Sequence, residues 1–513
     1  MNSQLAEALA RLPAYLGGHV AVSVTALLLG LAISLPLALV ATRRPGLRNL
    51  LLGLASIVQT IPSLALLALF YPLLLGLAAL CERVFGASFS ALGFLPSVLA
   101  LTLYSMLPVL RNTVTGLLGI SPAITEAARG VGMTPRQSLT MVELPLAMPI
   151  IMAGIRTAAI WVIGGATLST PIGQTSLGNY IFTGLQTQNW VFVLFGCVAA
   201  AVFALAVDQL LALMEHGLGR RKRGQVIAGG IGLAMLTLAA LIPLAAQPRS
   251  TYVIATKPFT EQYVLAALIE QKLSAAGLSA SVREGLGSAV IFDALRAGEI
   301  DVYVDYSGTI WTNQMHRTDV KPRAEVLTEM GDWLARQYGI KLLGGLGFEN
   351  AYTLAMPRAK AQALGIRSLA DLAGRSKELV IAGDYEFFGR PEWAAIRMAY
   401  GIAFREQRTM QPEFMYAAVA NGEVDVIAGY TSDGRIAQFG LVTLDDPKHA
   451  IPPYDAVLLL SPKRKDDTAL TAALKPLVDS INVAAMRAAN LRAATSSPTE
   501  AARWLSEQTG KER

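Results

Sequence analysis

Residues 126–145 read EAARGVGMTPRQSLTMVELP and interrupt a strongly apolar region with charges, glycines and prolines. Glu-Ala-Ala opens the stretch, a glycine follows four places after the last alanine, and nine further residues separate it from Val-Glu-Leu-Pro at 142–145. The small alanine side chains permit another surface to approach closely. The stretch is therefore a polar connection between two apolar runs, and those runs decide the fold that contains it.

The helix signals in and before this stretch occur twice. Ser121-Pro122 offers an N-cap and a first-turn proline for a short helix, which Gly130 and Gly132 then break. Thr134-Pro135 repeats the start signal, so we expect a second helix that runs to Pro145 and the next apolar run. The sequence predicts a compact helix–turn–helix with few flexible joints.

The two halves of the chain differ in composition. Up to Arg249 the sequence carries 14 Lys and Arg against 6 Asp and Glu, whereas the remainder carries 29 against 31. The basic excess sits in short loops between apolar runs, which is typical of membrane orientation rather than of a nucleic-acid surface. We expect a membrane domain over 1–247, an ordinary α/β domain over 248–513, and no nucleic-acid partner.

Six apolar runs of the first half are long enough to cross a bilayer, which takes about 20 residues. They lie at about 20–42, 50–80, 94–111, 147–168, 190–214 and 226–246. The second run is too long for one straight crossing and too short for two. We expect one crossing plus a broken or tilted portion, interrupted at Pro62 and Pro72.

The basic residues orient these runs. They cluster in the loops that follow the first, third and fifth runs, whereas the loops 81–93 and 169–189 contain Arg83 alone. By the positive-inside rule the three basic loops are cytoplasmic. Six crossings through lipid with an outside N-terminus satisfy every loop, place 112–146 in the cytoplasm, and leave 248–513 outside it.

The stretch 126–145 resembles the cytoplasmic coupling loop of ABC-type importer permeases. The resemblance implies that two short helices of the loop 112–146 seat in a groove of a separate ATPase. The residues that it assigns to this contact are Glu126, Ala127, Ala128, Gly132, Leu144 and Pro145. Because the chain has no G-x-x-x-x-G-K-[ST] nucleotide loop, we expect the partner to bind and hydrolyse ATP.

Short apolar strands alternate with helical patterns after residue 250. TYVIAT, IDVYVDY, ELVIAGD and EVDVIAG have the character of strands, with helical patterns between them. Such alternation indicates an α/β fold with mainly parallel sheets. The length suits two lobes, which we expect over about 251–350 with 456–513 and over about 351–455.

Six motifs of the second half identify a family. They are KPFTEQ (257–262), IDVYVDYSGTIW (300–311), ENAYTLAM (349–356), DYEFFGRPEW (384–393), NGEVDVIAGYTSDGRI (421–436) and LDDPKHAIPPYDAVLLL (444–460). Together they resemble the substrate-binding proteins of osmoprotectant importers, which take glycine betaine, choline, carnitine and related compounds. The first half is similar to the permease of the same systems. The resemblance implies a permease fused to its receptor in a bacterial cytoplasmic membrane.

In that family a box of aromatic rings holds a trimethylammonium head. A quaternary ammonium has no N–H to donate, so ring faces must attract the cation. Matched motif to motif, the cage tyrosines are Tyr306, Tyr352, Tyr430 and Tyr454. Tyr303, Tyr385, Phe387 and Phe388 are weaker alternatives that favour packing.

Polar residues near the motifs complete the candidate site. Gln262 and Thr309 match positions that support the ligand through polar contacts. Arg390 is a weaker candidate: its guanidinium suits a ligand carboxylate, and it equally suits tying its loop to Glu386 or Asp384. We expect no metal site, cofactor or catalytic group in this chain, because no ligand spacing or nucleophile–base pair occurs.

The sequence leaves three alternative functions open and also predicts an oligomeric state. Ergothioneine, a trimethylated histidine betaine, presents the same cationic head, and importers of it share this fused architecture. A ligand-gated channel or a membrane sensor would use the same two-lobed module, but the largest cytoplasmic piece here is the loop 112–146.

Arg156 and Asp208, charges at or near membrane depth, are candidates for a transport pathway. Since importers of this class pair two permeases, we expect a homodimer.

Overall fold

A computed structural model describes residues 3–86, 89–187, 189–246, 251–317, 319–384 and 386–511. The chain divides into two compact units, Met1–Phe182 with Val191–Pro248, and Thr183–Trp190 with Arg249–Arg513. The expected boundary between 1–247 and 248–513 falls among residues 247–250, which lie outside the described residues.

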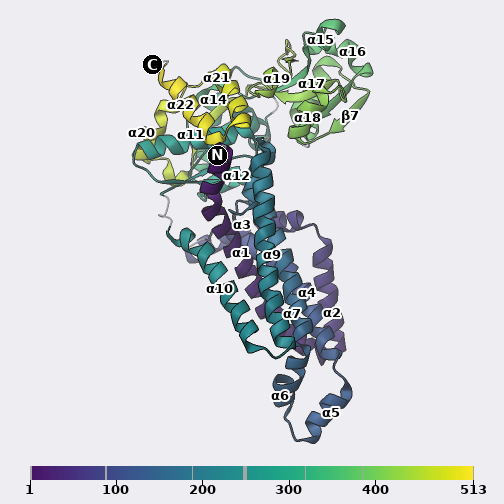
Figure 1. The fold of residues 1–513 in the computed structure, drawn as a ribbon. Coiled ribbons are helices and arrows are strands. Elements are labelled where there is room, and N and C mark those ends of the chain that lie inside the picture. Colours follow the sequence, from purple (N-terminus) through teal and green to yellow (C-terminus); the bar gives the residue numbers. More distant parts are fainter. Residues whose placement is uncertain are drawn as a thin grey trace. The chain divides into compact units, whose positions relative to one another are not determined.

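The first unit is helical (Figure 1). The helices from Ser3 to Ala246 are α1 (Ser3–Thr42), α2 (Pro45–Thr60), α3 (Ser63–Phe85), α4 (Phe94–Leu118), α5 (Pro122–Gly130), α6 (Pro135–Ser138), the π-helix η1 (Leu139–Glu143), α7 (Leu144–Ala166), the 3-10 helix η2 (Thr167–Ile172), α8 (Gly178–Gln186), α9 (Trp190–Gly219) and α10 (Arg223–Ala246). Among the described residues, six helical stretches are long and apolar enough to cross a membrane. This confirms the number expected from the sequence.

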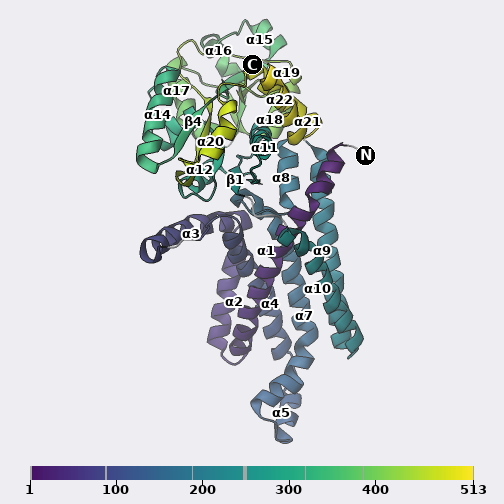
Figure 2. The ribbon, with the colours of Figure 1, turned by 90° about the vertical axis from the view of Figure 1, so that its left-hand side faces the viewer.

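The run 50–80 breaks once rather than twice. Ile61 has extended backbone angles between α2 and α3 and precedes Pro62, as the residue before a proline prefers. Pro72 instead lies inside α3, so the expectation of a second interruption there is wrong. A long apolar helix tolerates the one hydrogen bond that proline removes when neighbouring groups compensate. Figure 2 shows α3 lying at a steep angle to α2.

Helix α4 forms the centre of the first unit. Of the 18-residue apolar stretch of α4, 61% is buried, whereas the figure for α10, at the edge, is 11%. Small residues let α1 and α7 approach it closely: a Cβ at Gly30 would overlap Ser105 Oγ at 1.8 Å, and one at Gly154 would lie 2.6 Å from Asn112 Cβ. Apolar helices associate in lipid through such close contacts.

Charged side chains of the apolar helices α7 and α9 pair with one another. Arg156 of α7 donates from Nε and Nη2 to the two carboxylate oxygens of Asp208 on α9, each at 3.0 Å. Its Nη1 also donates to Glu215 Oε2 at 2.7 Å. Pairing of this kind is what makes ionised groups tolerable inside a membrane. The triad therefore ties α7 to α9, a role that the sequence did not reveal.

The second unit contains two five-stranded sheets. The first has the order β2-β1-β3-β10-β4, formed by β1 (Tyr252–Ala255), β2 (Ala280–Arg283), β3 (Val302–Tyr306), β4 (Lys341–Glu349) and β10 (Asp455–Leu460). The second has the order β7-β6-β8-β5-β9, formed by β5 (Tyr352–Pro357), β6 (Val380–Gly383), β7 (Glu406–Thr409), β8 (Val426–Tyr430) and β9 (Leu441–Thr443).

Each sheet is mixed, which corrects the expectation of mainly parallel strands. β1 is parallel to β2 and β3, whereas β10 is antiparallel to β3 and β4. In the second sheet β6 is parallel to β7 and β8, whereas β5 is antiparallel to β8 and β9. The antiparallel strands β4, β5 and β10 adjoin the two places where the chain passes between the sheets. Only parallel neighbouring strands require a helical crossover between them. A strand at which the chain enters or leaves a sheet has no such crossover and can therefore be antiparallel.

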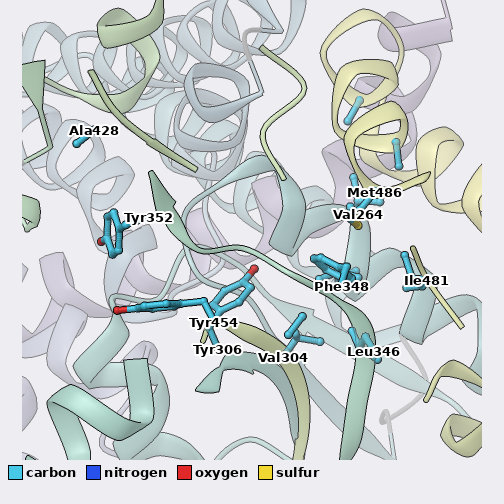
Figure 3. Close-up of a cluster of buried hydrophobic side chains, with 14 of the residues drawn as sticks. Val264, Val304, Tyr306, Leu346, Phe348, Tyr352, Ala428, Tyr454, Ile481 and Met486 are labelled. Atoms are coloured by element: carbon cyan, nitrogen blue, oxygen red, sulfur yellow. The ribbon is translucent and has the colours of Figure 1, made fainter. Parts of the chain in front are cut away.

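Helices flank both sheets. The main ones are α11 (Thr260–Ala275), α12 (Ser288–Arg296), α13 (Ser307–Thr309), α14 (Arg323–Tyr338), α15 (Arg358–Leu364), α16 (Leu369–Arg375), α17 (Pro391–Tyr400), α18 (Pro412–Ala420), α19 (Arg435–Gln438), α20 (Thr468–Leu474), α21 (Val483–Thr495) and α22 (Pro498–Lys511). One buried cluster continues from the aliphatic residues Val304, Leu346 and Ile481 to the aromatic residues Tyr306, Tyr352 and Tyr454 (Figure 3). The candidate cage is thus an extension of the core.

Candidate functional site

The loop between α4 and α7 forms two short helices at one end of the first unit (Figures 1 and 2). Ser121 precedes α5, but its side chain makes no capping bond. Thr134 caps α6 in full: its hydroxyl accepts from the backbone N–H of Gln137, and the Gln137 side chain accepts from the N–H of Thr134 at 2.8 Å. This reciprocal box stabilises the start of the second helix.

The turn between α5 and α6 depends on Gly132. Its φ of +83° lies in the left-handed region, which a side chain disfavours. The N–H groups of Gly132 and Met133 donate to the carbonyls of Arg129 and Ala128, which closes the end of α5. Gly130 is the last residue of α5 and Val131 is its C-cap, so Gly132 lies in the turn that follows the helix.

The second helix continues past Pro145 into the next apolar run, as the sequence predicted. The π-helix η1 runs directly into α7, and the N–H of Leu144 donates to the carbonyl of Leu139. A proline ring inside an α-helix clashes with the carbonyl four residues before it, and the wider π turn relieves this crowding. Ser138 Oγ also donates to Glu143 Oε1 at 2.7 Å across the turn. The candidate coupling loop is thereby continuous with α7.

The candidate coupling residues differ in exposure. Glu126, Ala127, Gly132 and Pro145 are exposed, Leu144 is half-buried, and Ala128 is buried. Large apolar side chains also stand exposed on this loop: Ile124 at 40%, Met141 at 65% and Val131 at 75%. Apolar side chains exposed together on a polar loop are typical of a protein-binding surface.

A cavity of about 280 Å³ in the second unit is lined by residues of both sheets. Its wall includes Thr309, Arg390 and all four candidate cage tyrosines. The volume lies at the small end of the range for ligand pockets. The structure thus brings together residues that span about 150 positions of sequence, from Tyr306 to Tyr454.

The strands set the positions of the tyrosines. Tyr352 and Tyr430 face each other directly across the antiparallel pair β5–β8, and their ring centroids are 5.0 Å apart. The Tyr454 ring meets Tyr352 edge-on at 5.7 Å, and Tyr306 lies close by at the end of β3 (Figure 3). A Cβ at Gly308 would lie 2.4 Å from the Tyr454 ring, so this position requires glycine.

Carboxylates hold three of the four phenols. Tyr306 Oη donates to Glu261 Oε1 at 2.6 Å, and Tyr430 Oη donates to Asp384 Oδ2 at 2.5 Å. Tyr454 Oη donates to Glu392. Burial, together with these carboxylates, raises the pKa of Tyr306, Tyr430 and Tyr454 well above the ordinary phenol value. The three phenols therefore remain protonated donors.

Arg390 is held inside the protein. Its Nε and Nη2 donate to the two carboxylate oxygens of Glu392 at 3.1 and 3.0 Å, and Nη2 donates to Tyr454 Oη at 3.0 Å. Burial alone would raise the pKa of Glu392, but Arg390 outweighs it and the pKa is lowered. Arg390 also approaches Glu386 at 3.5 Å, one of the two ties expected, and its guanidinium carbon lies 5.0 Å from the Tyr352 ring centroid.

Gln262 supports a ring rather than lining the cavity. Its Nε2 donates to the carbonyl of Val304 at 3.0 Å and to Tyr306 Oη at 3.1 Å. Thr309 does line the cavity, at the end of α13. Of the weaker aromatic alternatives, Tyr303 and Phe387 are fully buried and Phe388 is partly buried. Tyr385 lies outside the described residues.

Sequence reasoning missed the carboxylates. Glu261 accepts from Tyr306, from Asn350 Nδ2 at 3.1 Å and from Asn490 Nδ2 at 3.1 Å. Burial raises the pKa of Glu261. Asn490 also donates to the carbonyl of Ser432 at 3.0 Å, so this network joins α11 and α21 to segments beside the second sheet. The sequence feature that could have indicated Glu261 was its position next to Gln262 in the KPFTEQ motif.

Two family models match the chain. Residues 250–507 match the substrate binding domain of ABC-type glycine betaine transport systems. Residues 30–221 match the inner membrane component of binding-protein-dependent transport systems. The two matches fall on opposite sides of the change in composition.

Curated relatives and solved structures include three informative cases. The chain is 28% identical over 80% of its length to an ergothioneine transport permease/ergothioneine binding protein of Helicobacter pylori, covering 74% of that protein. It is 41% identical over 39% of its length to the choline transport system permease protein of Bacillus subtilis, covering 85% of it. A crystal structure of a glycine betaine/carnitine/choline ABC transporter aligns with a TM-score of 0.45 at 24% identity, covering 51% of this chain and 98% of that one.

Proposed function

This chain belongs to the family of substrate-binding domains of ABC-type glycine betaine transport systems, joined to a binding-protein-dependent permease, and on that premise we propose that its solute carries a trimethylammonium head. The protein is a multi-pass membrane permease with an extracytoplasmic binding domain, and it is not itself a catalyst. An ABC permease implies a separate ATPase partner.

The observation that carries the proposal is the cavity of about 280 Å³ walled by Tyr306, Tyr352, Tyr430 and Tyr454. Ring faces attract a desolvated cation by up to about 2 kcal/mol each, so several rings in one small cavity suit a quaternary ammonium. We call these four residues the tyrosine cage. Glycine betaine, choline and carnitine all fit this chemistry.

Ergothioneine is the second candidate, supported by the long match to the Helicobacter pylori protein. It shares the trimethylammonium head, so the tyrosine cage suits it equally. The candidates differ in their remainder: choline ends in a hydroxyl, the betaines in a carboxylate, and ergothioneine in a carboxylate and a thione-bearing ring. A ligand carboxylate would lie near Arg390, which is already paired with Glu392.

The test is a thermal-shift panel on the full-length chain in detergent, with glycine betaine, choline, carnitine, proline betaine and ergothioneine. A ligand that binds only the folded state raises the melting temperature according to RT ln(1+[L]/Kd). We expect at least one solute to raise it, and their ranking identifies the substrate. If none of the five shifts the transition, the proposed solute class is wrong.

The coupling loop is the proposed docking site for the ATPase. The exposed apolar residues Ile124, Val131 and Met141 support this assignment, because they are available to enter a groove of a partner. Glu126 is exposed on α5, the helix that also carries Ile124. The continuity of η1 with α7 gives the partner a direct lever on the membrane helices.

We also propose that two copies of the chain form one pathway with two ATPases. The support is the match to the inner membrane component of binding-protein-dependent transport systems, together with six candidate spans within the described residues. Native mass spectrometry of the purified chain tests this. A strictly monomeric protein in the presence of its ATPase would contradict the homodimer.

A further inference from the structure

The three carboxylates behind the tyrosine cage differ in their counter-charges. Glu392 is neutralised by Arg390 through two hydrogen bonds. Glu261 and Asp384 receive neutral donors instead: phenols, side-chain amides and, for Asp384, the backbone N–H of Phe387 at 2.7 Å. No Lys or Arg in the described part of the chain forms an ion pair with either of these two carboxylates.

Both carboxylates are buried, and both line the cavity. Glu261 is 3% exposed and Asp384 is 8% exposed, and each belongs to the cavity wall. Burying an ionised carboxylate without a cation is costly. A neutral acceptor such as glutamine or a carbonyl would hold a phenol without that cost. Burial raises the pKa of Glu261, so a cation supplied by the ligand would stabilise the ionised form of this carboxylate.

We propose that Glu261 and Asp384 are positioning residues that make the tyrosine cage select a cation over an uncharged solute of the same shape. This inference rests on the proposed function and deepens it. Each carboxylate fixes the orientation of one ring through its hydroxyl, and hydrogen bonding to an anion makes the aromatic ring more electron-rich. Both effects strengthen the attraction of the ring face for an ammonium.

The neighbouring cations of the cavity support this reading. Lys257 is paired with Asp305, and Arg435 with Asp433 at 2.6 Å. Arg390 is paired with Glu392 and also lies 3.5 Å from the exposed Glu386. Each of these three cations therefore has its own carboxylate, and Glu261 and Asp384 add to an excess of negative charge at the wall. Such a wall favours a solute with a positive head at the rings.

The experiment compares choline with its uncharged carbon isostere, in which carbon replaces the ammonium nitrogen. Both are measured on the full-length chain by displacement of the solute that binds most tightly in the panel. The variants are Asp384→Asn and Glu261→Gln, which remove charge but keep the shape and one carbonyl acceptor. Asp467→Asn is the matched control, because Asp467 also accepts a tyrosine hydroxyl, from Tyr252 at 3.0 Å, but lies outside the cavity.

We expect each cavity variant to lower the ratio of choline affinity to isostere affinity by about tenfold, and the control to leave it unchanged. A purely structural role would weaken both solutes equally and leave the ratio as it was, which would overturn the inference. Tyr430→Phe provides a second route, since it removes the hydrogen bond to Asp384 while keeping the ring; the ratio should fall there as well. If the wild-type chain binds no trimethylammonium solute at all, the proposed function itself fails.

Discussion

The coupling loop and the tyrosine cage each depend on a few side chains, but these side chains are exposed in the loop and buried in the cage. In the loop, Glu126, Val131 and Met141 are exposed, and the backbone is held by local devices such as the Thr134 capping box and Gly132. In the cage, the tyrosines are enclosed and tied to distant segments through buried carboxylates. On the proposed function, the exposed surface binds a protein partner, whereas the enclosed one binds a small solute. Changes in the two regions should therefore separate transport from binding.

Reversal of charge at Glu126 should give the largest effect. We expect Glu126→Lys to abolish transport while solute binding stays intact, because the residue is exposed on α5 and lies far along the chain from the cavity-lining residues. Uptake by vesicles and equilibrium binding are measured on the same preparation. Glu82→Lys, a reversal on another exposed helical residue, should transport normally. A Glu126→Lys chain with normal uptake would undo the coupling assignment.

Loss of Arg390 should give the next largest effect, on stability. Arg390→Gln leaves Glu392 buried without its cation, and breaking a buried pair in this way costs about 3 kcal/mol. Denaturant unfolding of the full-length chain measures the loss. Arg408→Gln is the control, because Arg408 and Glu406 form an exposed pair, and solvent screens such a pair so that it contributes little to stability. Equal losses in the two variants would contradict the buried network.

Removal of a cage ring should weaken binding of every trimethylammonium solute together. Tyr306→Ala or Tyr430→Ala each removes a ring face worth up to about 2 kcal/mol, so calorimetric titrations should show a common loss of affinity across the panel. Tyr338→Ala also removes a packed ring, next to Phe292 and Trp333, but outside the cavity. That variant should bind as the wild type does, and unchanged affinity in the cage variants would refute the cage.

Removal of the loop's cap should give the smallest effect. Thr134→Ala removes the hydroxyl that accepts from the Gln137 N–H, which costs about 1 kcal/mol of helix stability. Hydrogen exchange at the N–H of Gln137 should quicken, with a partial loss of transport and unchanged binding. Thr140→Ala is the control, since its hydroxyl bonds only the Arg136 carbonyl within the helix. Unchanged exchange in Thr134→Ala would show that the cap does not hold the loop.

Local patterns made much of the architecture predictable. Apolar runs and the positions of basic residues indicated six spans, and the X-Pro rule indicated the break at Pro62. Pro72 lies inside α3 without interrupting it, contrary to the expectation, and a π turn precedes Pro145. A proline by itself therefore did not mark where a helix ends, whereas an extended residue before a proline, as at Ile61, did.

In the candidate site, the tyrosines were predictable from the sequence but the partners of their hydroxyls were not. The tyrosines stand in recognisable motifs, and the structure brings all four to one cavity, although their role in binding stays a prediction. The partners of their hydroxyls were missed because each pair joins segments 45, 46 or 62 residues apart. The pairing of Arg390 with Glu392 was also missed, although only one residue separates them, because Glu386 and Asp384 were the partners considered.

The most direct test of the account is uptake by membrane vesicles that contain this chain and its ATPase. Each solute of the panel is presented in labelled form, with ATP and with a non-hydrolysable analogue. The account predicts ATP-dependent accumulation of at least one trimethylammonium solute by the wild type and its loss in Tyr430→Ala. Accumulation of none of them, or equal movement without ATP hydrolysis, would contradict it.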